Sequence, residues 1–193
     1  MKLYSGDKLN TISRFGSSND GPWYSVVNFD FSDEQKALQI EVQRFLSDRS
    51  GLSVARAVLN DSSMSHSEAV WQQMLDLGWA GIAIPEPYGG VGLGYLELCT
   101  MAHELGRSLA PVPFSSTVYQ FSEAVLRGGD EAQRQAVLAG VAAGATVGTL
   151  AFAEGLGFPV PGRIKLRFEE GRLHGEKWPV PDAMIADAAV VLA

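Results

Sequence analysis

The sequence predicts a mainly α protein: a bundle of amphipathic helices followed by a partial antiparallel β-domain. Three observations lead to this expectation. Apolar residues recur at helical spacing behind capping residues over much of 29–145. A Pro/Gly-rich stretch, 79–94, separates two of these patterns. From residue 146 the residues become small, β-branched or alternating, as in short strands. We therefore expect a helical domain over 29–145 and the beginning of a truncated β-domain over 146–193.

Composition excludes several classes of function. The 193 residues carry a net charge of −7, which argues against a nucleic-acid partner, because such proteins need a basic surface. An acidic surface also repels anionic lipid, and no apolar run approaches the ~20 residues of a membrane span. Three histidines and one cysteine leave little for a metal cluster, and no metal site is predicted. The single Cys99 rules out an intrachain disulfide and suits a reducing, cytoplasmic location.

Residues 1–28 show no period of either helix or strand. Ser, Gly, Asn and Asp surround scattered basic residues, and 16–22 is rich in turn-forming residues. We expect this segment to be a flexible tail or an expression leader.

Capping patterns mark the first helices. A capping box at 32–35 begins a helix whose apolar stripe includes Val42 and Leu46, and Ser50-Gly51 ends it. A short helix is expected at 52–60. A second capping box is predicted at 65–68, before a helix that ends at Gly78.

The stretch 79–94 is not expected to be a helix. Pro85 and Pro87 each remove a backbone donor and hold the preceding residue in an extended conformation. Four glycines, Gly89, Gly90, Gly92 and Gly94, permit close backbone approach. We predict an ordered, partly buried connector that sets the angle between two helices, and a plain surface loop is the alternative.

The next helix is predicted over 95–109 and contains two carboxylates that are candidates for an acid/base pair. Glu97 and Glu104 lie two turns apart, about 10 Å along the axis, which is too far to share a proton. Structural pairing or solvent exposure is therefore the preferred interpretation. His103 is expected to point away from Glu104, because neighbours on a helix diverge. The residues expected on the buried side are Leu96, Cys99, Ala102, His103 and Leu105.

The remaining pattern predicts two more helices and several strands. Ser115–Thr117 is expected to cap a helix that reaches Gly128-Gly129, and Asp130 caps another that reaches Gly140. Strands are expected within 146–153, 163–168, 173–177 and 188–193, with a hairpin turn at 169–172.

The stretch 79–94, together with Glu104-Leu105-Gly106-Arg107 and Pro111-Val112-Pro113, closely resembles the amino-terminal helical domain of the acyl-CoA dehydrogenase family. The resemblance runs from about Phe29 to the last residue. It implies an FAD-dependent α,β-dehydrogenation of an acyl-CoA thioester, as in fatty-acid or steroid side-chain catabolism. The family's catalytic carboxylate lies in a carboxy-terminal helical domain that this chain lacks. The resemblance therefore implies no catalytic residue here, and a chain that is inactive alone.

Two family segments that contact the flavin fall inside the chain. One aligns with 150–160 and retains Glu154, and the other aligns with 175–182 and retains Gly175 and Lys177. Hydroxyl and aromatic positions of the family have become alanine or proline, and proline nitrogen cannot donate. FAD binding is thus expected to be weak, lost or supplied by a partner subunit. The cofactor-binding positions implied by the resemblance are Leu150, Phe152, Ala153, Pro159, Pro179 and Pro181.

The resemblance also implies partners. These are an acyl-CoA substrate, an electron-transfer flavoprotein or similar acceptor, and a homo- or hetero-oligomer with another acyl-CoA dehydrogenase subunit. Two alternatives stay open. One is a non-catalytic structural or partner subunit of such a complex. The other is a flavin monooxygenase or oxidase of the same fold.

Overall fold

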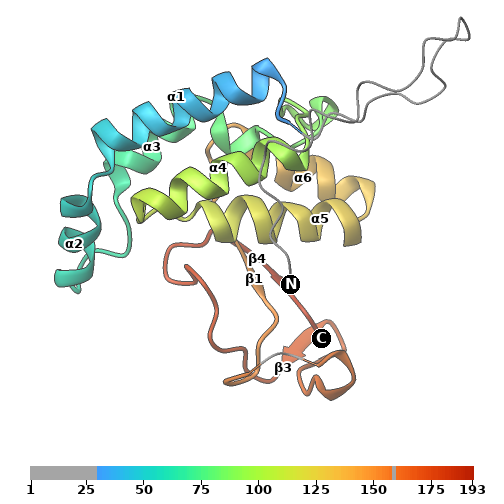
Figure 1. Cartoon of the computed structure of the whole chain (residues 1–193). Helices are drawn as coiled ribbons and strands as arrows, with labels where there is room; N and C mark the ends of the chain where they lie inside the picture. Colours follow the sequence, from blue (N-terminus) through green and yellow to red (C-terminus); the bar gives the residue numbers. More distant parts are fainter. Residues whose placement is uncertain (1–29, 158–159) are drawn as a thin grey trace, which may run out of the picture. The chain divides into compact units, whose positions relative to one another are not determined.

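The computed structural model describes residues 30–157 and 160–193, and all of these except Asp30 belong to one compact unit, 31–193. The expectations for the tail, 1–28, and for Pro159 lie outside the described residues. Figure 1 shows helices for most of the described chain and short strands near its end, which confirms a mainly α protein. The helices are α1 (Asp33–Arg49), α2 (Leu52–Asn60), α3 (Glu68–Asp76), α4 (Tyr95–Ser108), a π-helix (Ser115–Ser122), α5 (Glu123–Gly128) and α6 (Glu131–Ala142). The strands are β1 (Gly148–Ala151), β2 (Arg167–Glu169), β3 (Arg172–His174) and β4 (Ala188–Val191).

The two predicted capping boxes had different outcomes. At the start of α1 the box is complete: Gln35 N donates to Ser32 Oγ at 3.2 Å, and Ser32 N donates to Gln35 Oε1 at 2.9 Å. The box predicted at 65–68 is wrong, because α3 begins at Glu68 and its N-cap, Ser67, makes no side-chain capping bond. Ser67 is buried and its N–H donates to the carbonyl of Pro111 at 2.8 Å. This hydrogen bond links the start of α3 to the segment that follows α4.

The Pro/Gly connector is ordered and partly buried, as predicted. It contains two 3₁₀ turns, Trp79–Gly81 and Glu86–Tyr88, and buries the side chains of Trp79, Ile82 and Ile84. The chain folds back on itself, because Leu93 N donates to the carbonyl of Ile82 at 2.9 Å, and Gly92 N to that of Ile84. The connector therefore supplies core side chains between α3 and α4.

The predicted buried side of α4 is largely wrong. Cys99, Ala102 and His103 are exposed, and Leu96 is 57% exposed; Leu105 is half-buried against the core. The buried residues are Leu98, Thr100, Met101 and Glu104. The reason is that α4 is covered on two sides. Its Leu98 and Met101 enter the apolar core, and α1 packs along it, as Figure 1 shows.

The single helix predicted before Gly128 is divided into the π-helix and α5. The π-helix buries Val118 and Phe121 in the core and packs against β1. π-Helical turns within helices are frequent at functional sites, so this segment is a candidate part of one.

The strands form two small sheets. β2 and β3 make the predicted antiparallel hairpin, with Phe168 opposite Leu173. β1 and β4 differ from the expectation because they pair in parallel, from Gly148 opposite Ala188 to Ala151 opposite Val191. A parallel pair needs a crossover of a dozen or more residues, and 152–187 provide one.

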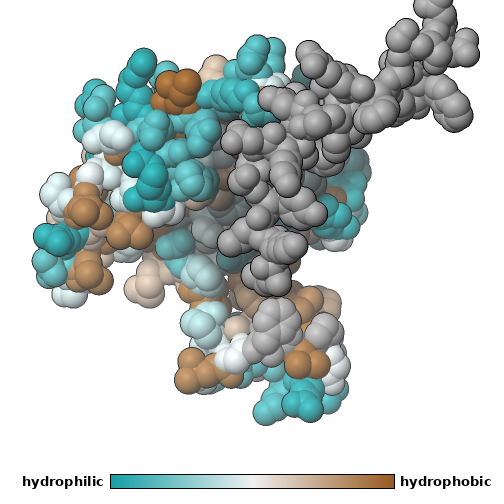
Figure 2. All heavy atoms as spheres, in the orientation of Figure 1, coloured by the Kyte–Doolittle hydropathy of each residue, from teal (hydrophilic) through white to brown (hydrophobic). Residues whose placement is uncertain are grey.

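The surface over α1 is mostly hydrophilic, whereas hydrophobic residues gather near α2 (Figure 2). Leu59 in α2 is 83% exposed and no α2 residue is fully buried.

Candidate functional site

Two of the predicted flavin positions line a common cavity. Leu150 in β1 and Phe152 just beyond it border a shallow hollow of about 470 Å³ that is largely open to solvent. The opposite wall comes from Tyr119 and Gln120 of the π-helix. The remaining lining residues are Glu123, Ala124 and Arg127. We call this space the strand cavity. It lies between the helical part of the chain and β1, the first strand. The resemblance places a flavin-contacting segment at this strand.

The side of β1 that faces away from β4 and toward the π-helix also carries backbone donors. Ala151 O accepts from Leu192 N at 3.1 Å, so this peptide faces β4. Gly148 N faces the other way and donates to Thr117 Oγ1 at 3.2 Å. Because backbone groups alternate along a strand, the N–H of Leu150 also faces away from β4.

The other predicted positions do not join this cavity. Ala153 is buried, and its carbonyl accepts from Trp178 N at 2.9 Å. Pro179 and Pro181 are exposed on the segment after Trp178, and neither lines the strand cavity. The carbonyl of Pro181 accepts from Thr149 Oγ1 at 2.6 Å. None of the three side chains offers a hydrogen-bond donor to a flavin, so the residues present do not fit a complete flavin site.

Each flavin-contacting segment retains one charged residue, Glu154 in the first and Lys177 in the second, and these two side chains contact each other. Lys177 Nζ donates to Glu154 Oε1 at 2.8 Å, and the two side chains are only 5% and 17% exposed. Glu154 also accepts from the backbone N–H groups of Lys165 (2.8 Å) and Leu166 (2.9 Å). The hydrogen bond from Lys177, followed by these N–H groups, lowers the pKa of Glu154 to about 2. Glu154 is therefore ionised at neutral pH and links the two segments. Sequence reasoning noted both residues but not their pairing.

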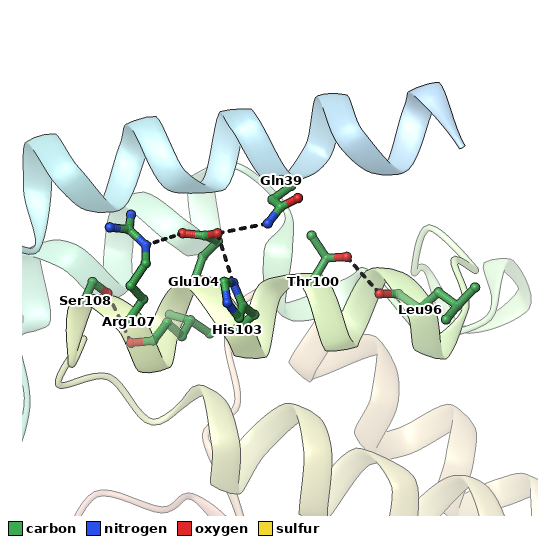
Figure 3. Close-up of polar contacts among 8 residues, drawn as sticks. Gln39, Leu96, Thr100, His103, Glu104, Arg107 and Ser108 are labelled. Atoms are coloured by element: carbon green, nitrogen blue, oxygen red, sulfur yellow. Dashed lines mark hydrogen bonds and ion pairs between the residues drawn. The ribbon is translucent and has the colours of Figure 1, made fainter. Parts of the chain in front are cut away.

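Glu97 and Glu104 are held in separate structural pairs, as predicted. Gln35 Nε2 of α1 donates to Glu97 Oε1 at 2.8 Å, and Gln39 Nε2 donates to Glu104 Oε1 at 3.2 Å. Arg107 Nε donates to the second oxygen of Glu104 at 2.8 Å. Figure 3 shows the Glu104 carboxylate between α1 and these α4 partners.

His103 and Cys99 contradict their predictions. His103 Nδ1 lies 3.1 Å from Glu104 Oε1, because both side chains bend toward the same point (Figure 3). Cys99 is exposed rather than in the core. Burial raises the pKa of Glu104, but hydrogen bonds from Arg107, Gln39 and His103 and the Arg107 charge outweigh burial, so the net pKa is lowered. This carboxylate is therefore a charged structural group and no candidate base.

Sequence reasoning missed a polar triad beside the strand cavity. Tyr95 OH donates to Glu123 Oε1 at 2.8 Å, and Arg127 Nε donates to Glu123 Oε2 at 2.7 Å. Arg127 Nη2 donates to Tyr95 OH at 2.7 Å. The Glu123–Arg127 spacing of four residues is a helical pairing signal that was available in the sequence. The contact with Tyr95 depends on how α4 lies against α5.

Within 30–157 and 160–193, no cluster of histidine, cysteine and acidic residues is arranged to hold a metal ion. No helix of this part of the chain is long and apolar enough to cross a membrane.

Comparison with known proteins agrees with this architecture. Residues 32–145 match the family model for the acyl-CoA dehydrogenase amino-terminal domain. Mitochondrial isovaleryl-CoA dehydrogenase of Pongo abelii is 29% identical over 168 residues, which cover 84% of this chain and 40% of that protein. Acyl-CoA dehydrogenase FadE28 of Mycobacterium tuberculosis is 32% identical over 132 residues, covering 68% of this chain and 38% of the relative.

Solved structures show the same fold. A steroid acyl-CoA dehydrogenase variant, Tcur3481–Tcur3483 G363A, superposes with a TM-score of 0.70 at 30% identity, covering 82% of this chain and 44% of that one. Butyryl-CoA dehydrogenase of Megasphaera elsdenii shares the fold with a TM-score of 0.70 at 22% identity, covering 86% of this chain and 45% of that one. This chain thus spans about two fifths of the length of such relatives. On the evidence of its helical domain, the chain belongs to the acyl-CoA dehydrogenase family.

Proposed function

We propose that this chain supplies the acyl-binding wall of an acyl-CoA dehydrogenase whose flavin contacts and catalytic base are largely provided by other sequence. The observation that carries the proposal is the strand cavity. It is lined by Tyr119 and Gln120 of the π-helix, by Leu150 of β1 and by Phe152 just after β1. The reaction class that follows from the family is α,β-dehydrogenation of an acyl-CoA thioester.

The cavity has properties that suit an acyl thioester. Its volume lies in the range of small-molecule sites, and its walls mix aromatic and aliphatic side chains with a few polar groups. Gln120 contributes an amide whose carbonyl oxygen is buried without a partner in the described chain. A buried acceptor left unpaired costs about 1–3 kcal/mol, so an N–H donor of the ligand, such as an amide of the CoA arm, would be stabilised there, whereas the thioester itself has only acceptors. The N–H of Leu150 is a backbone donor on the same side.

Among the described residues, no carboxylate at the strand cavity is free to act as base for the α-proton. Glu123 is the carboxylate at the cavity, and it is occupied by Arg127 and Tyr95. Glu104 and Glu154 are both held ionised by donors away from the cavity. The base is accordingly assigned to sequence outside 1–193 or to another subunit.

A second candidate is a non-catalytic partner subunit that has lost the flavin. Ala153, Pro179 and Pro181 favour it, because none supplies a side-chain donor and the two prolines supply no backbone donor either. The name of the solved steroid enzyme joins two components, Tcur3481 and Tcur3483. By analogy we propose a hetero-oligomer with another acyl-CoA dehydrogenase subunit in the cytoplasm, passing electrons to an electron-transfer flavoprotein.

Ligand binding by the chain alone tests the first proposal. Butanoyl-CoA is titrated by calorimetry into the unmodified chain, Phe152→Ala and the control Phe168→Ala, whose ring lies 66% exposed in the β2–β3 hairpin. We expect saturable binding that Phe152→Ala weakens about tenfold, equivalent to about 1.4 kcal/mol, and that Phe168→Ala leaves unchanged. No binding, or equal loss in both variants, would refute it.

A titration with FAD tests whether the chain has lost its flavin site. Flavin fluorescence is followed as the chain is added, first alone and then with a candidate partner subunit. Saturable quenching by the chain alone would contradict loss of the flavin site. Quenching that needs the partner would support the partner-subunit candidate.

A further inference from the structure

A second cavity lies on the other side of the polar triad. It measures about 380 Å³ and is bounded by the Pro/Gly connector, chiefly Ala83, Pro85 and Leu93, and by Leu126 of α5. We call it the connector cavity. Glu123 and Arg127 line both this cavity and the strand cavity, so the two spaces share one wall.

The shared wall is polar, neutral overall and near the surface. Glu123 and Arg127 form an ion pair at 2.7 Å, and Tyr95 hydrogen-bonds to both. The Arg127 side chain is 71% exposed and that of Glu123 is 25% exposed. Exposed ion pairs contribute little to stability, so this wall can move at small cost. Arg127 is also a long, flexible side chain whose charge can be solvated wherever it swings.

The space behind the wall is apolar. Leu93, Leu126 and Ala83 provide its floor, whereas its polar side chains already satisfy one another in the triad. Such a cavity favours hydrocarbon over a charged or strongly hydrogen-bonding ligand, because burial of a polar group without a partner is costly.

We propose that the two cavities form one acyl-binding groove with a displaceable wall, in which a long or bulky acyl group passes Glu123 and Arg127 and ends in the connector cavity. The inference rests on the proposed function and adds a substrate class to it. Each cavity alone lies at the small end of the range for ligand sites, whereas both together accommodate a chain much longer than butanoyl. Leu93 and Leu126 become specificity-determining residues for the distal end of the acyl group.

The test fills the connector cavity and leaves the strand cavity unchanged. Leu93→Trp places a larger ring there, and Leu96→Trp is the control, because Leu96 is also a surface leucine, 57% exposed, and lines neither cavity. Butanoyl-CoA and dodecanoyl-CoA, the latter below its micellar concentration, are titrated into each folded chain. We expect Leu93→Trp to weaken dodecanoyl-CoA binding about tenfold and to change butanoyl-CoA binding less than twofold. Leu96→Trp should change neither.

Removing the wall gives a second, opposite readout. Arg127→Ala should tighten dodecanoyl-CoA binding about threefold more than it alters butanoyl-CoA binding, because only the longer acyl chain has to displace the wall. If neither thioester binds the unmodified chain, the proposed function fails. If butanoyl-CoA binds but dodecanoyl-CoA does not, or if Leu93→Trp affects both lengths equally or neither, the continuous groove is wrong while the proposed function stands.

Discussion

Glu154 and Lys177 form an ion pair of 2.8 Å that joins the segment after β1 to the segment before Trp178. The same region is held by backbone bonds, since Gly155 N donates to Trp178 O at 2.8 Å and Trp178 N donates to Ala153 O at 2.9 Å. Lys177 Nζ also lies 3.4 Å from the carbonyl of Phe152, which lines the strand cavity. The ion pair thereby supports one wall of the candidate site.

Replacing Glu154 by Gln should destabilise the chain in a pH-dependent way. The pKa of Glu154 is lowered from 4.5 to about 2, so its ionised form stabilises the fold above pH 4.5. That contribution is lost as the pH falls through the folded pKa near 2. We expect the difference in urea midpoint between the unmodified chain and Glu154→Gln to be largest at pH 7 and to shrink between pH 4.5 and 2. A difference that does not vary with pH would contradict the pairing.

The buried carboxylate of Glu104 should make Arg107 important for stability. Arg107→Leu removes the donor to Glu104 Oε2 and leaves that buried oxygen without its charged partner. We expect a loss of about 2 kcal/mol in the free energy of unfolding. The control is Arg44→Leu, whose 4.0 Å pair with Glu41 is on the surface, 70% and 66% exposed, and should contribute less than ~0.5 kcal/mol. Equal effects in urea denaturation would show that the Glu104 contact is not buried in solution.

Two glycine-to-alanine changes should have opposite effects. A Cβ at Gly90 would collide with the backbone of Ile84 in the connector, so Gly90→Ala should destabilise strongly. A Cβ at Gly106 in α4 meets no atom within 4 Å, so Gly106→Ala should stabilise by about 0.5–1 kcal/mol through helix propensity. Thermal unfolding followed by circular dichroism measures both, and a neutral Gly90→Ala would mean that the connector packs loosely.

Thr149 should restrain the proline segment. Thr149→Val removes the 2.6 Å hydrogen bond to the carbonyl of Pro181 while keeping the side-chain shape. We expect faster amide hydrogen exchange at 182–185 and a stability loss of about 1 kcal/mol. The control Thr100→Val removes a bond of 3.0 Å to Leu96 within the same helix, and it should leave exchange at 182–185 unaltered. Unchanged exchange in Thr149→Val would show that this tether is not formed in solution.

Features that depend on neighbouring residues could be predicted from the sequence, whereas features that depend on long-range packing could not. The helix at 33–49, its capping box and the ordered connector were predicted correctly, because caps, prolines and glycines act on neighbouring residues. The buried side of α4 was predicted wrongly. Apolar residues occur around most of that helix, and only its packing between α1 and the core decides that Met101 is buried and Leu96 exposed.

The same limit applied to the candidate site. The resemblance selected Leu150 and Phe152, which the structure brings into one cavity, but also Ala153, Pro179 and Pro181, which lie apart from it. The triad of Tyr95, Glu123 and Arg127 was missed, because Tyr95 lies on a different helix from its partners.

By itself the sequence determined the helical class, the connector between α3 and α4, the β2–β3 hairpin and the family, since each depends on residues close together in the chain. Only the tertiary structure decided the parallel pairing of β1 with β4, the burial of a charged Glu104 and the wall between the two cavities. These features join residues tens of positions apart. Their free energies depend on burial and on contact distance, which local sequence patterns do not encode.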